Sequence, residues 1–207
     1  WAAAKESEAF AEEMCPMEIA QGRKTLTVDR DEHARPQTTL ETLAKLPTVF
    51  KKDGVVTAGN ASGICDGAAM LVVADAEWAK AQGLKPLAKL VQWGVAGVEP
   101  SLMGIGPAPA IRSALERAGV AIGDVDLFDV NEAFAPQFLA VQKELGLPDE
   151  KVNVNGGAIA LGHPLGASGA RITANLIYTL KKRGKRLGVG SACIGGGQGI
   201  AVVLESV

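Results

Sequence analysis

From about Cys65 onward, short apolar runs alternate with amphipathic stretches, and this alternation restricts the fold more than any other feature of the chain. Apolar runs of four to eight residues are typical of buried strands, and apolar residues spaced by three and four are typical of helices. Such alternation indicates an α/β fold in which helices cover a sheet.

The expected elements follow one another in the order βαβαβα, then a loop, then αββ. Strands are predicted at 68–74, 87–95, 125–130, 186–193 and 199–204, and helices at 76–82, 107–118, 133–145 and 168–183. Asp75 is expected to cap the first of these helices, and Gly119 and Gly184 are expected to follow helix ends. The last two strands are close enough in sequence to pair antiparallel. We therefore expect a mixed sheet.

Residues 1–63 do not show this alternation of apolar runs and amphipathic stretches. They predict an initial helix, a hairpin around 21–24, a polar stretch over 29–39 and a short helix ended by Pro47. This unit is too small and rich in loops to form an independent core. The first residues read as the middle of a helix, without an initiator methionine or a cap. We therefore expect the chain to begin inside a longer protein.

Composition excludes several classes of protein. The formal net charge is −2 and 47% of the 207 residues are hydrophobic, so neither nucleic acid nor an anionic membrane is expected as a partner. No apolar run approaches the roughly 18 residues that a membrane span needs. The three cysteines have neither metal-ligand spacing nor a disulfide pattern, which favours a reducing compartment and no metal site.

Polar side chains set among glycines mark the C-terminal half as the candidate site. Of 25 glycines, 12 lie between Gly156 and Gly199, which favours close approach of the backbone to a ligand. His163 lies in this region, directly before a predicted helix. A lone histidine at a turn is more often solvated or packed in the core. Two further segments of the same character, 131–135 and 193–199, favour an active site instead.

Six motifs occur in an order that is typical of one enzyme family. Each is weak by itself, whereas the ordered set is specific. The motifs are Asp31-Glu-His-Ala-Arg-Pro-Gln-Thr-Thr-Leu, Thr57-Ala-Gly-Asn-Ala-Ser-Gly, Met103-Gly-Ile-Gly-Pro, Asn131-Glu-Ala-Phe-Ala, Gly162-His-Pro-Leu-Gly and Cys193-Ile-Gly-Gly-Gly-Gln-Gly. On these motifs the chain resembles the thiolases over essentially its whole length, and among them the mitochondrial 3-ketoacyl-CoA thiolases.

The resemblance implies the C-terminal half of a thiolase fold, βαβαβαββ, with residues 1–63 as the end of the loop domain and residues 64–207 as the C-terminal domain. It implies CoA-dependent cleavage of a 3-oxoacyl-CoA to acetyl-CoA and a shortened acyl-CoA, and the reverse Claisen condensation. The family's nucleophilic cysteine lies in its N-terminal half, and neither Cys15 nor Cys65 stands in that context. We therefore expect the chain alone to be inactive and to need the N-terminal half of the same thiolase as its partner.

Four catalytic positions follow from the resemblance. His163 matches the base that activates the nucleophile and serves as an oxyanion donor. Cys193 matches the second catalytic cysteine, which moves the acetyl-CoA proton, although alone it would read as a packed thiol at a strand end. Asn131 matches the residue that positions a water at the enolate oxygen, with a helix cap ahead of Ala133 as the other interpretation. The N–H of Gly195 matches a second oxyanion hole, where the absence of a Cβ allows close approach.

Coenzyme A and acyl-CoA are implied as substrates, with no covalently bound cofactor. Ser62 matches a contact to pantetheine, Met103 a residue that lines its tunnel, and Arg35 a cation beside the nucleotide end. A solvated surface charge is an equally good interpretation of Arg35. The resemblance also implies a homodimer or homotetramer.

Two alternative interpretations agree less well with these motifs. Ketoacyl synthases share the fold, but they pair their cysteine with two histidines or with His and Asn, which disagrees with the Cys193 loop. A non-catalytic thiolase-like protein that binds acyl-CoA or sterol would be expected to have lost His163, Cys193 or Asn131. The resemblance favours the mitochondrial matrix, with the bacterial cytoplasm as the alternative, and the C-terminal Glu-Ser-Val is not a peroxisomal address.

Overall fold

A four-stranded mixed sheet, in the order β3-β6-β5-β4, organises the computed structural model, which describes residues 1–207. The strands are β3 (Ala88–Gly97), β4 (Leu127–Val130), β5 (Leu187–Ile194) and β6 (Gln198–Ser206). β4 and β5 are parallel, while β6 runs antiparallel to both β5 and β3. The predicted mixed sheet and the antiparallel pairing of the last two strands are therefore confirmed.

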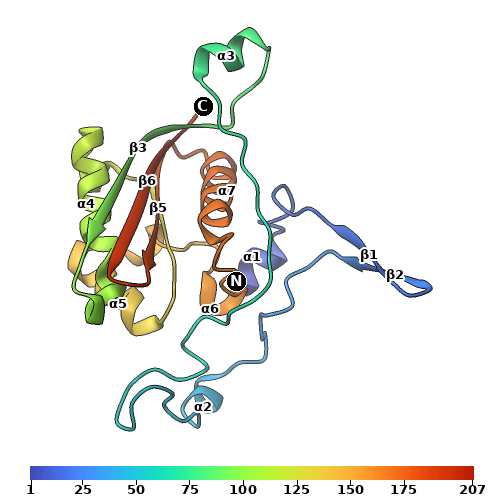
Figure 1. The fold of residues 1–207 in the computed structure, drawn as a ribbon, viewed down its shortest axis with the longest axis vertical. Helices are drawn as coiled ribbons and strands as arrows, with labels where there is room; N and C mark the ends of the chain where they lie inside the picture. The colour runs from blue at the N-terminus through green and yellow to red at the C-terminus, as the bar shows by residue number, and fades with distance from the viewer.

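Helices cover both faces of this sheet (Figure 1). α4 (Pro107–Ala118) and α5 (Ala135–Leu145) lie on one face, and α7 (Ser168–Lys182) lies on the other. Successive residues of a strand point to opposite faces. Accordingly, Phe128 of β4 joins the apolar cluster under α4 and α5, whereas Leu127 joins the cluster under α7. These helices were predicted to within two residues at each end, and the molecule has the expected helix–sheet–helix layers.

Short elements complete this part of the chain. They are three 3-10 turns, η1 (Pro100–Ile105), η2 (Ile122–Asp124) and η3 (Asp149–Lys151), and the single-turn helix α6 (Ala158–Leu161). Gly119 follows α4 with φ of 66°, a left-handed conformation that glycine adopts without strain, as predicted. No helix is both long and apolar enough to cross a membrane.

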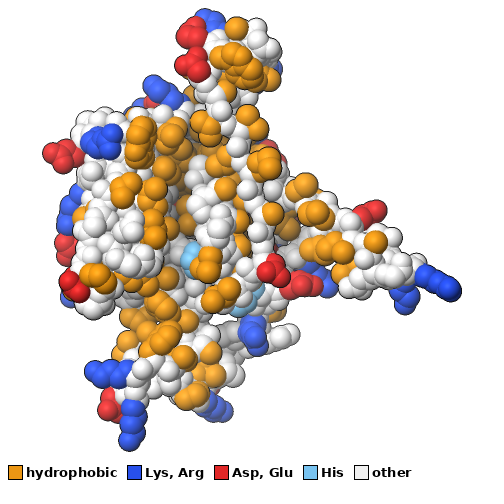
Figure 2. Space-filling view, viewed as in Figure 1, with side chains coloured by type: hydrophobic (Ala, Val, Ile, Leu, Met, Phe, Trp, Pro, Cys, Tyr) orange, Lys and Arg blue, Asp and Glu red, His pale blue; other side chains and the backbone are white.

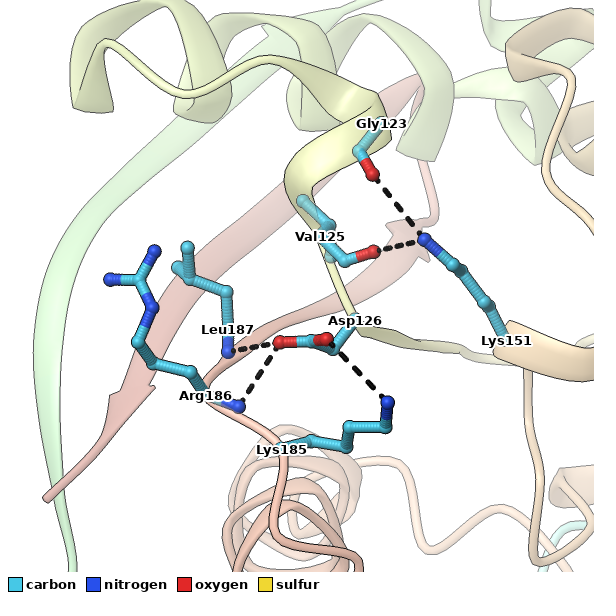
Figure 3. A network of polar contacts seen from close by, with 7 residues as sticks. All are labelled: Gly123, Val125, Asp126, Lys151, Lys185, Arg186 and Leu187. Carbon is cyan, nitrogen blue, oxygen red and sulfur yellow. Dashed lines mark hydrogen bonds and ion pairs between the residues drawn. The ribbon is translucent and has the colours of Figure 1, made fainter.

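A polar network fixes the start of β4 against the start of β5 (Figure 3). The Asp126 carboxylate accepts hydrogen bonds from the N–H groups of Arg186 and Leu187, at 3.0 and 2.9 Å. These backbone donors lower the pKa of Asp126, with Lys185 and Lys151 contributing through their charges. Lys151 also donates to the carbonyls of Gly123 and Val125. The network lies at the end of the parallel strands opposite to their carboxyl ends, where it has a structural role.

Most of the first 83 residues extend away from the sheet, while residues 7–13 are hydrogen-bonded to α7 (Figure 1). Their elements are α1 (Ala2–Glu6), the hairpin β1 (Met17–Gln21) and β2 (Lys24–Val28), α2 (Leu40–Leu43) and α3 (Ala76–Ala81). The hairpin and these three short helices were predicted. Asp75 caps α3 by accepting hydrogen bonds from two backbone N–H groups. Figure 2 shows hydrophobic side chains exposed over much of this stretch.

The strand predicted at 68–74 is not formed. These residues are extended but make no backbone hydrogen bond, and Met70, Val72 and Val73 are 90%, 89% and 80% exposed. A strand that is apolar on both faces needs a neighbouring strand and a cover on each side. The chain provides neither at this position, so the apolar run remains unpaired.

Candidate active site

The carboxyl ends of β4 and β5 define one edge of the candidate site. Asn131 directly follows β4, and its N–H donates to the carbonyl of Ser191 at 2.8 Å. Cys193 lies near the end of β5. Because the two strands are parallel and Val130 pairs with Ser191, Asn131 and Cys193 emerge at the same edge of the sheet.

The His163 loop is held against the segment that precedes 68–74. The N–H of His163 donates to the carbonyl of Gly63 at 2.8 Å, and Ile64 forms an isolated parallel bridge with His163. Gly162 has φ of 91°, and a Cβ there would lie 2.6 Å from the sulfur of Cys65. Only glycine fits this close crossing, which explains the small residue directly before the histidine.

The segment around Ser62 joins the two halves of the site. The Ser62 N–H and hydroxyl both donate to the carbonyl of Ala133, at 3.0 and 3.2 Å. Two residues away, the N–H of Ala135 donates to the carbonyl of Asn60 at 2.8 Å. The segment therefore runs between the Asn131 loop and the His163 loop, and the structure brings Ser62 next to both.

Asn131 and His163 are in contact. The side-chain nitrogen of Asn131 lies 3.4 Å from Nε2 of His163. Asn131 is 1% exposed, and its Oδ1 has no hydrogen-bond partner. The interpretation of Asn131 as a helix cap is wrong, because α5 begins only after Phe134. The N–H groups of Ala133 and Phe134 donate instead to the side-chain oxygen of Gln137. A buried amide with a free acceptor beside an imidazole is typical of a polar binding site.

Ser168 completes the environment of His163, and the sequence interpretation missed it. Nδ1 of His163 lies 2.6 Å from the Ser168 hydroxyl oxygen. Burial lowers the pKa of His163, and the positive charge of Arg171 lowers it further. The imidazole is therefore neutral near pH 7, as a general base must be. The signal for Ser168 was present as a serine at the start of the helix that follows the histidine.

The thiol of Cys193 is half-buried, and this burial raises its pKa. The following loop turns at Gly196 and Gly197, with φ of 88° and 89°. Gly195 differs from them, because it is exposed and a Cβ built on it would meet no atom within 4 Å. The fold of this chain therefore does not itself require glycine at 195, and open space lies beside that residue.

Two acidic residues, Asp129 and Glu132, lie within two residues of Asn131 in the sequence and contribute to the surroundings of the site. Burial raises the pKa of Asp129 to about 7, with Glu132 raising it further and Arg171 opposing the increase. The Glu132 carboxylate accepts hydrogen bonds from the Asn153 side chain and the Ile159 N–H, at 2.9 and 3.2 Å. Glu132 thus ties the Asn131 loop to the segment that leads to His163, consistent with a supporting role.

The remaining candidate residues lie farther from this cluster. Met103 is half-buried in η1, and Arg35 is exposed and its side chain forms no ion pair. His33, for which we assign no role, lies against Gly63, where a Cβ would overlap its ring. No group of three or more His, Cys, Asp or Glu side chains is arranged to hold a metal ion.

An imidazole, a thiol and a buried amide at the carboxyl edge of an α/β sheet suit proton transfer next to a developing anion. The thiolase C-terminal domain family matches residues 84–206, and the thiolase N-terminal domain family matches residues 1–77. The chain belongs to the thiolase family.

Curated relatives are similar over the whole chain. It is 58% identical to the mitochondrial 3-ketoacyl-CoA thiolase of Mus musculus, covering 100% of this chain and 52% of the mouse protein. It is 54% identical to the acetyl-CoA acetyltransferase of Escherichia coli, covering 99% of this chain and 52% of that enzyme. The chain therefore spans about half the length of the curated relatives it matches.

Solved structures agree with these relationships. The acetyl-CoA acetyltransferase of Bacillus anthracis superposes with a TM-score of 0.97 at 52% identity, covering 100% of this chain and 52% of that one. Human mitochondrial 3-ketoacyl-CoA thiolase in complex with CoA superposes with a TM-score of 0.92 at 54% identity, covering 100% and 51%. The predicted thiolase fold is confirmed.

Proposed function

We propose that this chain provides the acid–base and oxyanion-binding part of a 3-ketoacyl-CoA thiolase. The reaction is the CoA-dependent cleavage of a 3-oxoacyl-CoA to acetyl-CoA and a shortened acyl-CoA, and its reverse. The observation that carries the proposal is the contact between Asn131 and His163 at the sheet edge where Cys193 emerges. The nucleophilic cysteine is contributed by the N-terminal half of a thiolase, because neither Cys15 nor Cys65 stands in the nucleophile's sequence context.

Each group has a task that the chemistry requires. Nε2 of His163 takes the proton of the nucleophile's thiol, so that the thiolate attacks the thioester or ketone carbon. In the condensing direction, Cys193 takes a proton from the methyl carbon of acetyl-CoA, and in the cleaving direction it returns a proton to the leaving enolate. Asn131 and His163 stabilise the enolate oxygen, and the N–H of Gly195 serves the tetrahedral intermediate.

CoA is the proposed substrate that the chain binds outside this cluster. Ser62 contacts the pantetheine arm, Met103 lines its path and Arg35 lies near the nucleotide. The relatives named above include mitochondrial and bacterial enzymes, so we propose fatty-acid oxidation in the mitochondrial matrix as the setting, with the bacterial cytoplasm as the alternative. The assembly is a homodimer or homotetramer of complete thiolase subunits.

Complementation tests this proposal. The chain is purified alone and after co-expression with the N-terminal half of the mouse relative, and loss of acetoacetyl-CoA is followed in the presence of CoA. We expect turnover only from the combined protein, and only with an acyl group on the added half. Turnover by residues 1–207 alone through Cys15 or Cys65 would overturn the proposal that the N-terminal half contributes the nucleophilic cysteine. Binding of CoA by the combined protein without turnover would instead support a non-catalytic thiolase-like protein.

A further inference from the structure

The Ser168 hydroxyl bridges His163 and a backbone carbonyl. Its oxygen lies 2.6 Å from Nδ1 of His163 and 3.2 Å from the carbonyl oxygen of Pro164. Ser168 is 2% exposed and is the first residue of α7, so water does not compete for either contact. The backbone of the same residue is fixed as well, because its N–H donates to the Pro164 carbonyl at 2.9 Å. The hydroxyl therefore has a defined position beside the ring.

The partners of the two ring nitrogens indicate where the proton lies. A neutral imidazole carries one proton, on either Nδ1 or Nε2. Nε2 lies 3.4 Å from the amide nitrogen of Asn131, which is a donor, and this contact favours a lone pair on Nε2. The proton is then on Nδ1 and donates to the Ser168 oxygen. The Ser168 proton turns to the Pro164 carbonyl, and every donor in this series of contacts faces an acceptor.

We propose that Ser168 is a positioning residue that holds His163 in the form protonated at Nδ1, with Nε2 free to act as the base. This inference deepens the proposed function and rests on it for the identity of the reaction. The tautomer itself is a property of this chain and is measurable without any turnover. Ser168 touches neither substrate nor the reacting atoms in this scheme and acts only through the imidazole.

The arrangement prepares His163 for two successive tasks at one nitrogen. When Nε2 takes the thiol proton, the S–H bond breaks, its electron pair stays on sulfur and an N–H bond forms at Nε2. The ring is then an imidazolium whose Nδ1–H remains on Ser168. The new proton at Nε2 then needs an acceptor other than the Asn131 amide nitrogen, which is itself a donor, and the substrate oxygen that becomes negative serves as that acceptor. One orientation of the ring thus supports both proton removal and oxyanion stabilisation.

A hydroxyl suits this position better than a carboxylate. A carboxylate beside Nδ1 would favour the charged ring and raise the pKa of His163. Here the partner is neutral, and burial and Arg171 both act to keep the ring uncharged. The base is therefore available at neutral pH, while its orientation is still fixed by a hydrogen bond.

The experiment measures the tautomer and the chemistry separately. The chain has two histidines, so labelling it with 15N-histidine gives signals only from His33 and His163 in the complex with the unlabelled N-terminal half. We compare wild type with Ser168→Ala, Ser168→Thr and the control Ser191→Ala. Ser191 is a buried serine, 4% exposed, whose hydroxyl donates to the Ile200 carbonyl at 2.7 Å. The kinetic measurements are the rate of acylation by acetyl-CoA, its pH dependence and the Kd of CoA.

Wild type and Ser191→Ala should show a protonated Nδ1 and an unprotonated Nε2 above the pKa of His163. Ser168→Ala should move the ring toward the Nε2–H form and slow acylation about 10- to 100-fold, within the range of a general-base contribution. The Kd of CoA should stay within about twofold in that variant, because binding does not need the tautomer. Ser168→Thr should restore both the tautomer and the rate.

An Nε2–H ring in wild type, or an unchanged tautomer and rate in Ser168→Ala, would overturn the inference while leaving the proposed function intact. A complex that shows the Nδ1–H form but turns over no substrate would overturn the proposed function and leave the positioning role standing. If Ser168→Ala does not fold, Ser168→Cys nearly preserves the volume and replaces the hydroxyl with a weak hydrogen-bonding group. The same loss of tautomer and rate is then expected from Ser168→Cys.

Discussion

Residues 84–206 and residues 1–77 differ in how far they bury their apolar side chains. The large side chains that are fully buried, among them Phe128, Ile111 and Leu180, all lie in the first of these regions. The second region contributes only Ala4 to the buried hydrophobic residues. An apolar pattern therefore produces a packed element only where the same chain supplies the opposing surface.

The candidate site residues are also distributed between these two regions. His163 and Asn131 lie on loops of the packed region and Cys193 lies near the end of its strand β5, whereas Ser62 and Arg35 lie in the extended region. Only the segment around Ser62 is hydrogen-bonded to the packed region near the site. The proposed catalytic groups thus all lie in the packed region, whereas Ser62 and Arg35 of the extended region are proposed only as contacts to CoA, and substitutions in the two regions should have different effects.

The largest expected effect contrasts two cysteines, one from each region. In the complex with the N-terminal half, Cys193→Ala should lower turnover about 100- to 10,000-fold, because it removes a general acid–base group. Acylation of the nucleophile should be much less affected. Cys15→Ala, an exposed cysteine of the extended region, should leave both rates unchanged. Turnover of Cys193→Ala within a few-fold of wild type would contradict the assignment.

A pair of leucines tests the packing difference directly. Leu180 is 0% exposed in α7, and Leu40 is 80% exposed in α2. Leu180→Ala should lower the free energy of unfolding by about 2–5 kcal/mol through lost burial and a residual cavity. Leu40→Ala should change it by less than about 0.5 kcal/mol. Denaturant titration of the complex measures both, and equal effects would show that the extended region is packed in solution.

The buried carboxyl of the packed region should make stability depend on pH. Burial raises the pKa of Asp129 from its usual 3.8 to about 7, so the folded state binds the proton more tightly. This contribution is complete below about pH 4 and is lost as pH rises through 7, by at most about 4 kcal/mol. Asp129→Asn should remove that slope, whereas Asp53→Asn, an exposed control, should keep it. Parallel curves for wild type and Asp129→Asn would contradict the prediction.

The sequence predicted the packed region well for a physical reason. The helix 107–118 starts at a proline, ends at a left-handed glycine and packs on a sheet of the same chain, so local signals and tertiary contacts agree. The strand at 68–74 failed because no other segment of this structure pairs with it. At the site, the motifs located His163 and Asn131, but no spacing rule indicates that Ser168 hydrogen-bonds the ring. Such contacts depend on the turn between α6 and α7, which only the structure shows.

The unpaired segment 68–74 offers a further test of the difference between the two regions. Adding the N-terminal half of a thiolase should slow backbone amide exchange over 68–74 by about 100-fold, because strand pairing satisfies N–H groups that are now free. Exchange over α4, which is already packed in this chain, should change little. Exchange that stays fast over 68–74 in an active complex would show that this segment does not join a sheet.

A smaller effect is expected at Arg35, whose side chain is exposed and forms no ion pair within the chain. An ion pair formed in water contributes about 0.2–1 kcal/mol, so Arg35→Gln should raise the KM for CoA at most about fivefold and leave kcat unchanged. The difference should disappear at high salt, because the Debye length falls to about 3 Å at 1 M. Arg23→Gln removes the same charge at the exposed tip of the hairpin and is the matched control. This variant should leave the KM for CoA unchanged. A lower kcat in Arg35→Gln would contradict the division, because a residue of the extended region would then be contributing to the chemical step.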